Sequence, residues 1–251
     1  MLNIIGIIKA AVLNGTPLLF GTSGEILTQK SGNMNLGVEG LMFMGGAFGL
    51  AGAFTYSNVA GEAASGAIAI IIAILCAFTA GFLGSLIFSF LTVTLKANQN
   101  VTGLALTIFG TGVGQFVGEI MRIKIGGNVT IPNALKNAFV NPVMPEFLRK
   151  IPFAGELLFS YNLFVYIGVA MVIVMHYFLN KTRKGLNLRA VGESPATADA
   201  AGINVTRYRY LATCIGGGIS ALGGMMKMPT TSGFFSITCI LPCTSISRIT
   251  S

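Results

Sequence analysis

Charged residues are scarce in this chain. Only 10% of its 251 residues are Asp, Glu, Lys or Arg, whereas 53% are hydrophobic. Because roughly a quarter of the residues in soluble domains are charged, this composition excludes a soluble globular protein and indicates an integral membrane protein. The formal net charge of +8 does not indicate nucleic-acid binding, since the basic residues lie mainly between apolar runs, next to anionic headgroups.

Metal-binding and aromatic recognition residues are also few. The chain has four cysteines, one histidine and no tryptophan. Cys76 and Cys214 lie inside apolar segments, where a thiol behaves as a small hydrophobic group, so we predict neither a disulfide framework nor a zinc site. His176 lies near a basic segment edge, which is typical of an interfacial side chain. We therefore expect no metal, no cofactor and no catalytic residue.

A nucleotide-binding loop is absent from the glycine-rich segments. Gly110, Gly114 and Gly118 recur every four residues, but no Gly-Lys-Ser/Thr sequence follows them, so they do not form a phosphate-binding loop. Small residues at this spacing instead let transmembrane helices pack with their backbones close together. The same spacing recurs at Gly45 and Gly49, and at residues 216, 220 and 224. We expect a compact bundle that does not hydrolyse ATP itself.

Long apolar runs, in contrast, are abundant. A helix needs roughly 20 apolar residues to cross a bilayer core, and the candidate runs are residues 2–28, 41–56, 66–95, 101–120, 161–179 and 211–226. Residues 66–95 contain no charge and exceed the required length, so this helix is expected to be tilted or to project. The pattern predicts an all-α, polytopic membrane helical bundle with about six transmembrane segments.

A polar, glycine-rich stretch, TQKSGNMNLGVEG at residues 28–40, interrupts this apolar pattern. One interpretation is an ordinary cytoplasmic hairpin turn, in keeping with the usual length of such connections. The other is a broken helix with Asn33, Asn35 and Glu39 partly at membrane depth. Irregular backbone survives there only where it lines protein or a water-filled cavity, so the second interpretation makes these residues candidates for a solute path.

A second polar group, KANQNVTG, lies at the start of the run at 101–120. Asn100 is predicted to cap this helix, because an Asn side chain can accept hydrogen bonds from the first free backbone N–H groups. The alternative is that this group lines a pore.

The stretch GLNLRAVGESPATADAAGINVTRYRY, residues 185–210, is a polar, basic insert between two apolar segments. Ser194 suits an N-cap, Pro195 suits the first helical position, and Gly202 can end the Ala-rich helix that follows. Seven helical residues rise only about 10 Å and are not stable alone. The insert is therefore either a docking helix or an ordinary loop with one helical turn.

The distribution of Lys and Arg predicts the orientation of the chain. If the insert is cytoplasmic, eight basic residues lie on the inside: Lys30, Lys96, Lys181, Arg183, Lys184, Arg189, Arg207 and Arg209. Five lie in the outside loop: Arg122, Lys124, Lys136, Arg149 and Lys150. Because basic loops favour the cytoplasmic side, we place the insert in the cytosol.

Three blocks, SGNMNLGVEGLMFMGGAF, ANQNVTGLAL and GLNLRAVGESPATADAAGINVTRYRYLA, together resemble the permease subunits of bacterial ABC importers for nucleosides and simple sugars. This family is kin to the branched-chain amino acid and ribose permeases. The resemblance covers about residues 15 to 226, with the blocks in family order. It implies a multi-pass protein of the cell membrane, with a membrane permease domain at 1–226 and a cytoplasmic coupling loop at 181–210.

The same resemblance implies several partners. A second permease, in a heterodimer, would form half of the translocation path, a cytosolic ABC ATPase would hydrolyse ATP, and an extracellular binding protein or lipoprotein would deliver the solute. The residues implied to dock on the ATPase are Glu193, Ser194, Pro195, Ala198, Asp199, Ala200 and Gly202. Those implied to line the path are Asn33, Asn35, Glu39, Gln99, Asn100 and Thr102.

Residues 227–251 depart from the family pattern. They read KMPTTSGFFSITCILPCTSISRITS and lack an apolar run of spanning length, whereas family members usually continue with further membrane segments. We interpret them as an atypical tail, truncated or frame-shifted. Two other classes stay open, a secondary transporter and a membrane scaffold that transports nothing. Glu25 and Glu119 lie near span ends, which argues against ion coupling at the midplane of the bilayer.

Overall fold

The computed structural model describes residues 4–60, 65–125 and 161–227. The predicted tail lies outside these residues apart from Lys227, as do Lys136, Arg149 and Lys150. The described part is helical and contains no strand. Its elements are α1 (Ile4–Lys30), α2 (Val38–Ala60), α3 (Gly66–Ser89), the π-helix η2 (Phe90–Thr94), α4 (Gln99–Ile125), α8 (Leu163–Lys181), α9 (Arg183–Glu193), α10 (Pro195–Ala200) and α11 (Val205–Lys227).

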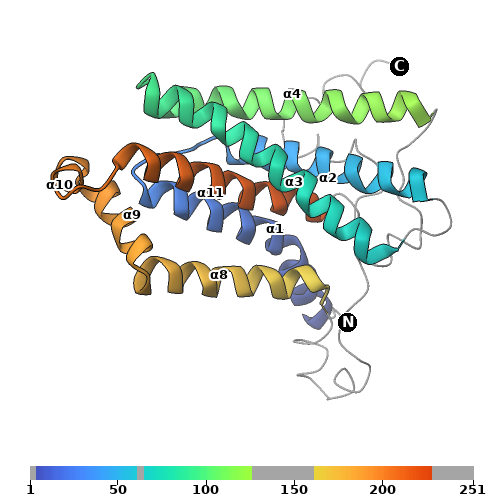
Figure 1. The fold of residues 1–251 in the computed structure, drawn as a ribbon. Coiled ribbons are helices and arrows are strands. Elements are labelled where there is room, and N and C mark those ends of the chain that lie inside the picture. Colours follow the sequence, from blue (N-terminus) through green and yellow to red (C-terminus); the bar gives the residue numbers. More distant parts are fainter. Residues whose placement is uncertain (1–3, 61–64, 126–160, 228–251) are drawn as a thin grey trace.

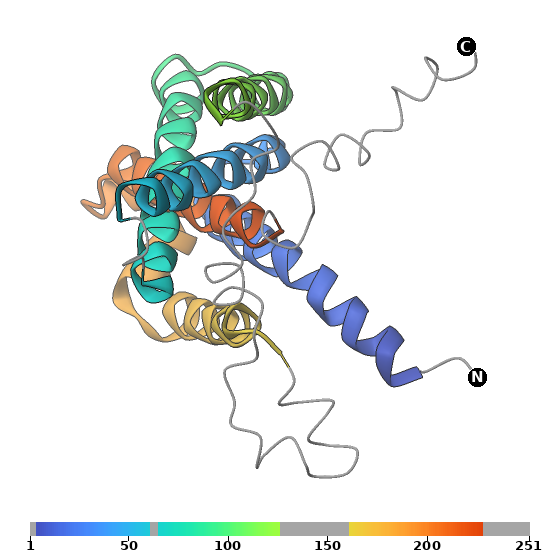
Figure 2. The same cartoon turned by 90° about the vertical axis from the view of Figure 1, so that its right-hand side faces the viewer.

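Helix α11 lies in the middle of the bundle. It packs against α1, α2 and α3, while α4 and α8 lie at opposite edges, α4 on α2 and α8 on α1 (Figure 1). The N-terminal part of α1 extends away from the other helices (Figure 2). Because neighbouring helices cover α11, it can carry the fully buried polar residues Thr213 and Ser220.

All six predicted apolar segments form long helices. Four of them, α2, α3 with η2, α4 and α8, are long and apolar enough to cross a membrane by length and composition. The other two, α1 and α11, have 27 and 23 residues. The prediction of an all-α, polytopic helical bundle is therefore confirmed for the described part of the chain.

Close contacts between glycines and the backbone of neighbouring helices hold the bundle together. A Cβ added at Gly24 of α1 would lie 2.1 Å from the carbonyl oxygen of Gly216 on α11. One at Gly45 of α2 would lie 2.4 Å from the carbonyl oxygen of Ala221, and one at Gly110 of α4 would lie 2.5 Å from that of Gly40. The i+4 spacing of small residues thus correctly predicted close helix packing.

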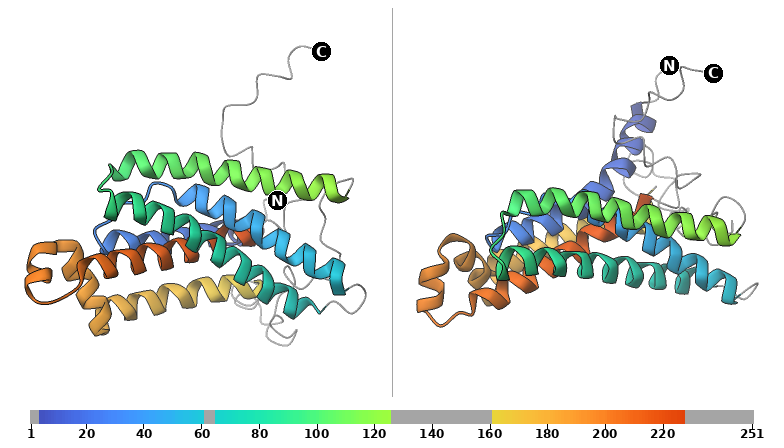
Figure 3. Two further views of the ribbon diagram at one scale, coloured as in Figure 1. Left: turned by 45° about the horizontal axis from the view of Figure 1, so that its top comes forward. Right: turned by 90° about the horizontal axis from the view of Figure 1, so that it is seen from above.

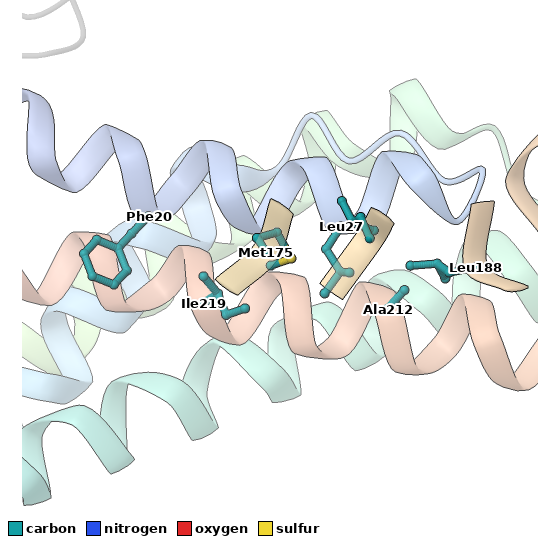
Figure 4. Packing of buried hydrophobic residues seen from close by; sticks show 7 residues of the cluster. Phe20, Leu27, Met175, Leu188, Ala212 and Ile219 are labelled. Atoms are coloured by element: carbon teal, nitrogen blue, oxygen red, sulfur yellow. The ribbon is translucent and has the colours of Figure 1, made fainter. Parts of the chain in front are cut away.

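A hydrophobic cluster fills the space between α1, α8, α9 and α11 (Figure 4). It contains Phe20 and Leu27 of α1 and Ala212 and Ile219 of α11, and α8 and α9 supply its other members, Met175, Leu179 and Leu188. Leu188 is 3% exposed, so the cluster fixes the C-terminal end of α8 and the start of the insert to the bundle.

The predicted helix at 66–95 is not a regular α-helix to its end. It changes at Phe90 into the π-helix η2, in which the Leu95 N–H donates to the Phe90 carbonyl oxygen (3.1 Å). The Thr94 and Tyr210 hydroxyl groups form a hydrogen bond that links η2 to α11. Lys96 follows with a φ of +52° and turns the chain toward α4. Hydropathy predicts the length of this segment but not its hydrogen-bond register.

We expect Gly24→Ala to destabilise the protein and Gly15→Ala to leave it unchanged, although both residues lie in α1. A methyl group at Gly24 would meet backbone atoms of α11, whereas nothing lies within 4 Å of one at Gly15. Overpacking of this kind costs about 1–3 kcal/mol of unfolding free energy. Thermal unfolding in detergent measures both variants, and equal midpoints would contradict the role assigned to the Gly24 contact.

Candidate functional site

The insert lies at one end of the bundle. Most of the Lys and Arg residues predicted to face the cytosol lie at the same end. α1, η2 and α8 end there, and α4 and α11 begin there (Figure 1 and Figure 3). Exposed basic residues at this end include Lys30, Lys96, Lys181, Arg183 and Lys184. Arg122 and Lys124 lie at the other end of α4. The structure thus brings these basic residues to the end that carries the insert, and the cytoplasmic side of that end stays a prediction.

The insert contains a helix that the sequence analysis missed. α9 runs from Arg183 to Glu193, and the Thr182 side chain caps it by accepting a hydrogen bond from the Gly185 N–H (3.0 Å). Gly185, Leu188 and Val191 form its buried face. Thr182 followed by these residues at a spacing of three was the available signal. α9 therefore connects α8 to the exposed part of the insert as a folded element.

The predicted docking helix is present as α10. Pro195 occupies its first position and Gly202 follows it with a φ of +81°, as expected for a C-terminal glycine. Ser194 occupies the predicted N-cap position, but the predicted capping bond is wrong, because its side chain forms no capping hydrogen bond. The backbone closes the first turn instead, as the Ala198 N–H donates to the Ser194 carbonyl oxygen (3.1 Å).

α10 packs on the bundle through one small side chain. Ala198 is 3% exposed, and α10 contacts both α9 and α11. Glu193, Asp199 and Ala200 are exposed. An open groove of about 600 Å³ lies between α10 and the start of α11. Three predicted docking residues, Pro195, Asp199 and Gly202, line this groove, so the helix presents a hollowed, accessible surface.

The connection between α1 and α2, residues 31–37 (the 31–37 segment), is buried on one side. The side chains of Asn33 and Asn35 are 1% and 4% exposed, whereas those of Met34 and Leu36, which alternate with them, are 53% and 49% exposed. Ser31 is also fully buried. Alternate residues thus face opposite sides, as in an extended strand.

Side chains from three helices form hydrogen bonds with the backbone of this segment and with the Asn33 amide nitrogen, whereas the buried Asn33 Oδ1 has no partner among the described residues. Asn33 Nδ2 donates to Thr213 Oγ1 of α11 (3.1 Å). The Met34 N–H donates to Gln99 Oε1 of α4 (2.8 Å), and the Asn35 N–H donates to Glu25 Oε1 of α1 (3.1 Å). Because irregular backbone inside a membrane bundle needs such partners, these contacts allow the segment to remain unwound.

The segment runs alongside α4 rather than beyond the helix ends. Its start contacts Gln99, the first residue of α4, and Thr107 Oγ1 donates to the Leu36 carbonyl oxygen (3.3 Å). Gln99 and Thr107 are eight residues apart, or about 12 Å along a helix. Residues 31–37 therefore pack along the first turns of α4 as an unwound segment between α1 and α2, and their position at membrane depth stays a prediction.

The residues predicted for the solute path fall into two groups. Asn33, Asn35 and Thr102 are buried, whereas Glu39 and Asn100 are exposed and Gln99 is half-buried. The predicted Asn100 cap is wrong. Asn98 caps α4 instead, because its Oδ1 accepts from the Asn100 N–H (3.0 Å) and the Val101 N–H (3.5 Å). The structure brings the six residues to one end of the bundle, and their role in a path stays a prediction.

Within the described residues, no group of three or more His, Cys, Asp or Glu side chains could hold a metal ion.

Comparisons with known proteins agree with this architecture. The family model for the branched-chain amino acid transport system permease component matches residues 7–242. The chain is 33% identical over 220 residues to a putative glucose ABC transporter permease protein of Haloferax volcanii, covering 87% of this chain and 61% of that protein. It is 29% identical over 244 residues to a nucleoside ABC transporter permease protein of Lactococcus lactis, covering 95% and 73%.

A guanosine ABC transporter permease protein of Bacillus subtilis is 33% identical over 221 residues, which cover 87% of this chain and 65% of that protein. The aligned part of the chain thus spans 61% to 73% of the length of these three relatives. No solved structure matches the chain.

We expect Asn35→Ala to destabilise the protein more than Met34→Ala. Asn35 Oδ1 accepts from the Gly37 N–H (2.9 Å), and its loss leaves a buried donor unpaired at a cost of about 1–3 kcal/mol. The neighbouring Met34 side chain is half exposed, so its removal should change the free energy of unfolding by about 0.5 kcal/mol or less. Denaturation in detergent measures the difference, and equal losses would contradict the role of the Asn35 amide.

Proposed function

Because the chain belongs to the family of branched-chain amino acid transport system permease components, we propose that it is the membrane-spanning permease subunit of an ATP-driven ABC importer. It is a multi-pass membrane protein with several helices apolar enough to cross a bilayer. In this proposal it forms part of a solute path, and a separate subunit hydrolyses ATP. The observation that carries the proposal is α10, a short helix exposed at the end of the bundle that also carries the basic residues.

The contact with the ATPase is proposed to be made by α10 and its two flanking turns. The residues concerned are Glu193, Ser194, Pro195, Ala198, Asp199, Ala200 and Gly202. Their arrangement supports this role, because Ala198 attaches the helix to the bundle while Glu193 and Asp199 remain accessible. The groove beside α10 offers the partner a concave surface. A helix of six residues is stable only through such contacts.

The proposed solute is a nucleoside or a simple sugar. Two of the relatives are named as nucleoside or guanosine permeases and one as a putative glucose permease. The proposed path residues, Asn33, Asn35, Glu39, Gln99, Asn100 and Thr102, are mostly uncharged hydrogen-bonding groups, which suits a neutral, hydroxyl-rich solute. A second permease would complete the path, and an extracellular binding protein or lipoprotein would deliver the solute.

Ion-coupled secondary transport finds little support in the described helices. Such transport needs free ionisable groups within the spans. Glu119 instead pairs with Arg122 near the end of α4 (2.8 Å). Glu25 lies near the end of α1 rather than at its middle, and one of its carboxylate oxygens accepts a hydrogen bond from the 31–37 segment.

We expect Gly202→Pro to abolish capture of the ATPase and Gly202→Asn to preserve it. Proline fixes φ near −65° and cannot adopt the +81° of Gly202, whereas Asn tolerates the left-handed region. Affinity capture of the co-produced ATPase from detergent extracts should fall at least tenfold for Gly202→Pro. Undiminished capture by this variant would show that the shape of α10 is not what the ATPase binds.

The proposed orientation predicts which side of the membrane α10 faces. Thr197 is exposed on α10, so Thr197→Cys, in a chain whose native cysteines are replaced, should react with a membrane-impermeant maleimide only after the cells are opened. Labelling in intact cells would place α10 outside and would exclude contact with a cytosolic ATPase.

A further inference from the structure

The end of α9 touches both the last residue of α1 and the 31–37 segment through backbone atoms. A Cβ added at Gly192 would lie 2.3 Å from the Lys30 carbonyl oxygen and 3.2 Å from the Gly32 nitrogen. Gly32 has a φ of +86°, and a Cβ there would lie 3.3 Å from Gly192 Cα. The two glycine backbones meet directly, with Arg209 Nη2 of α11 beside them at 3.1 Å from the same Cβ position, so a displacement of this end of α9 acts on the backbone of the segment.

The helix that follows α10 in the chain also contacts the 31–37 segment. α10 is followed by α11, and Thr213 of α11 accepts the hydrogen bond from Asn33 Nδ2. Thr213 is 0% exposed and Asn33 is 1% exposed, so water does not compete for this bond. The two helices that flank α10 in the chain, α9 and α11, therefore both hold the 31–37 segment, one at Gly32 and one at Asn33.

Beyond these contacts the segment continues along the chain into α2, and it also contacts α4. The Met34 N–H is bound by Gln99 of α4, and a Cβ at Gly40 of α2 would lie 2.6 Å from Thr107 Cα. A shift of the segment therefore has to move the packed pair formed by α2 and α4.

We propose that Gly192 and Thr213 are positioning residues that move the 31–37 segment when α10 moves. The contact at Gly192 and the Asn33–Thr213 hydrogen bond transmit the displacement from the two sides of α10, and the segment passes it to α2 and α4. This inference rests on the proposed function, because it requires an ATPase that displaces α10.

Met34 provides a reporter for this movement, since its side chain is 53% exposed in the middle of the segment. The parent for the experiment is the full chain with its native cysteines replaced and with Met34→Cys. It is co-produced with the ATPase, and the rate of maleimide labelling is measured in opened membranes with and without Mg-ATP and vanadate. We expect the nucleotide to change the labelling rate at least threefold.

Gly192→Ala should reduce this change to less than 1.5-fold, while capture of the ATPase stays within twofold of the parent. The matched control is Gly112→Ala, since nothing lies within 4 Å of a Cβ at that helical glycine, and it should retain the full change. A full nucleotide response in Gly192→Ala overturns the proposal, as does an unresponsive parent that still captures the ATPase. If the parent captures no ATPase, the proposed function itself has failed.

Thr213 tests the second contact independently, even if Gly192→Ala is not recovered from membranes. Thr213→Val removes the acceptor of the Asn33 bond at nearly constant shape, whereas Thr213→Ser keeps the hydroxyl group. We expect the labelling response to fall at least twofold for Thr213→Val and to persist for Thr213→Ser. Equal responses from the two variants would show that this hydrogen bond transmits no movement.

Discussion

The structure depends on the close approach of helix backbones at glycines. Without water between helices inside a bilayer, the hydrophobic effect does not hold them together, and van der Waals contact has to do so. The contact between Gly24 and Gly216 and the contact between Gly40 and Gly110 bring α1, α11, α2 and α4 near enough for such contact. This proximity also lets the side chains of Glu25, Gln99 and Thr213 reach the 31–37 segment. Glycine packing thus brings the hydrogen-bonding partners close enough to stabilise the unwound 31–37 segment inside the bundle.

The polar contacts and the exposed insert meet at the same end of the molecule. α9 carries Gly192 against the segment, α10 presents an accessible helix, and α11 returns into the middle of the bundle. A partner that binds α10 therefore acts on elements that are already in contact with α1, α2 and α4. For a permease subunit, this arrangement links the surface proposed to meet the ATPase with the residues proposed to form the solute path.

Much of the fold followed from the sequence, because long apolar runs and glycine spacing report directly on membrane helices and their packing. The limits of α10 were also predictable, since Pro195 fixes its own φ at a helical value and Gly202 readily adopts the positive φ that ends the helix. The contacts of the 31–37 segment were not predictable, because they join residues as distant as Asn33 and Thr213. α9 was missed since its buried face has only three residues. The cap at Asn100 was wrong because several polar residues lie at the start of α4, and Asn98 is the one that accepts the bonds. At α10 Ser194 has the predicted N-cap position but its side chain forms no capping bond.

The π-helix η2 determines how the end of α3 meets its neighbours beside the insert. A π turn contains one residue more than the α-helical register accommodates, and each helical residue corresponds to a rotation of about 100°. The extra residue therefore sets the rotational phase of everything that follows Ser89, including the Thr94 hydroxyl group that meets Tyr210. Chain length within Phe90–Thr94 is consequently as important as residue identity, since a one-residue deletion would restore a regular helix and turn this polar contact toward a different neighbour.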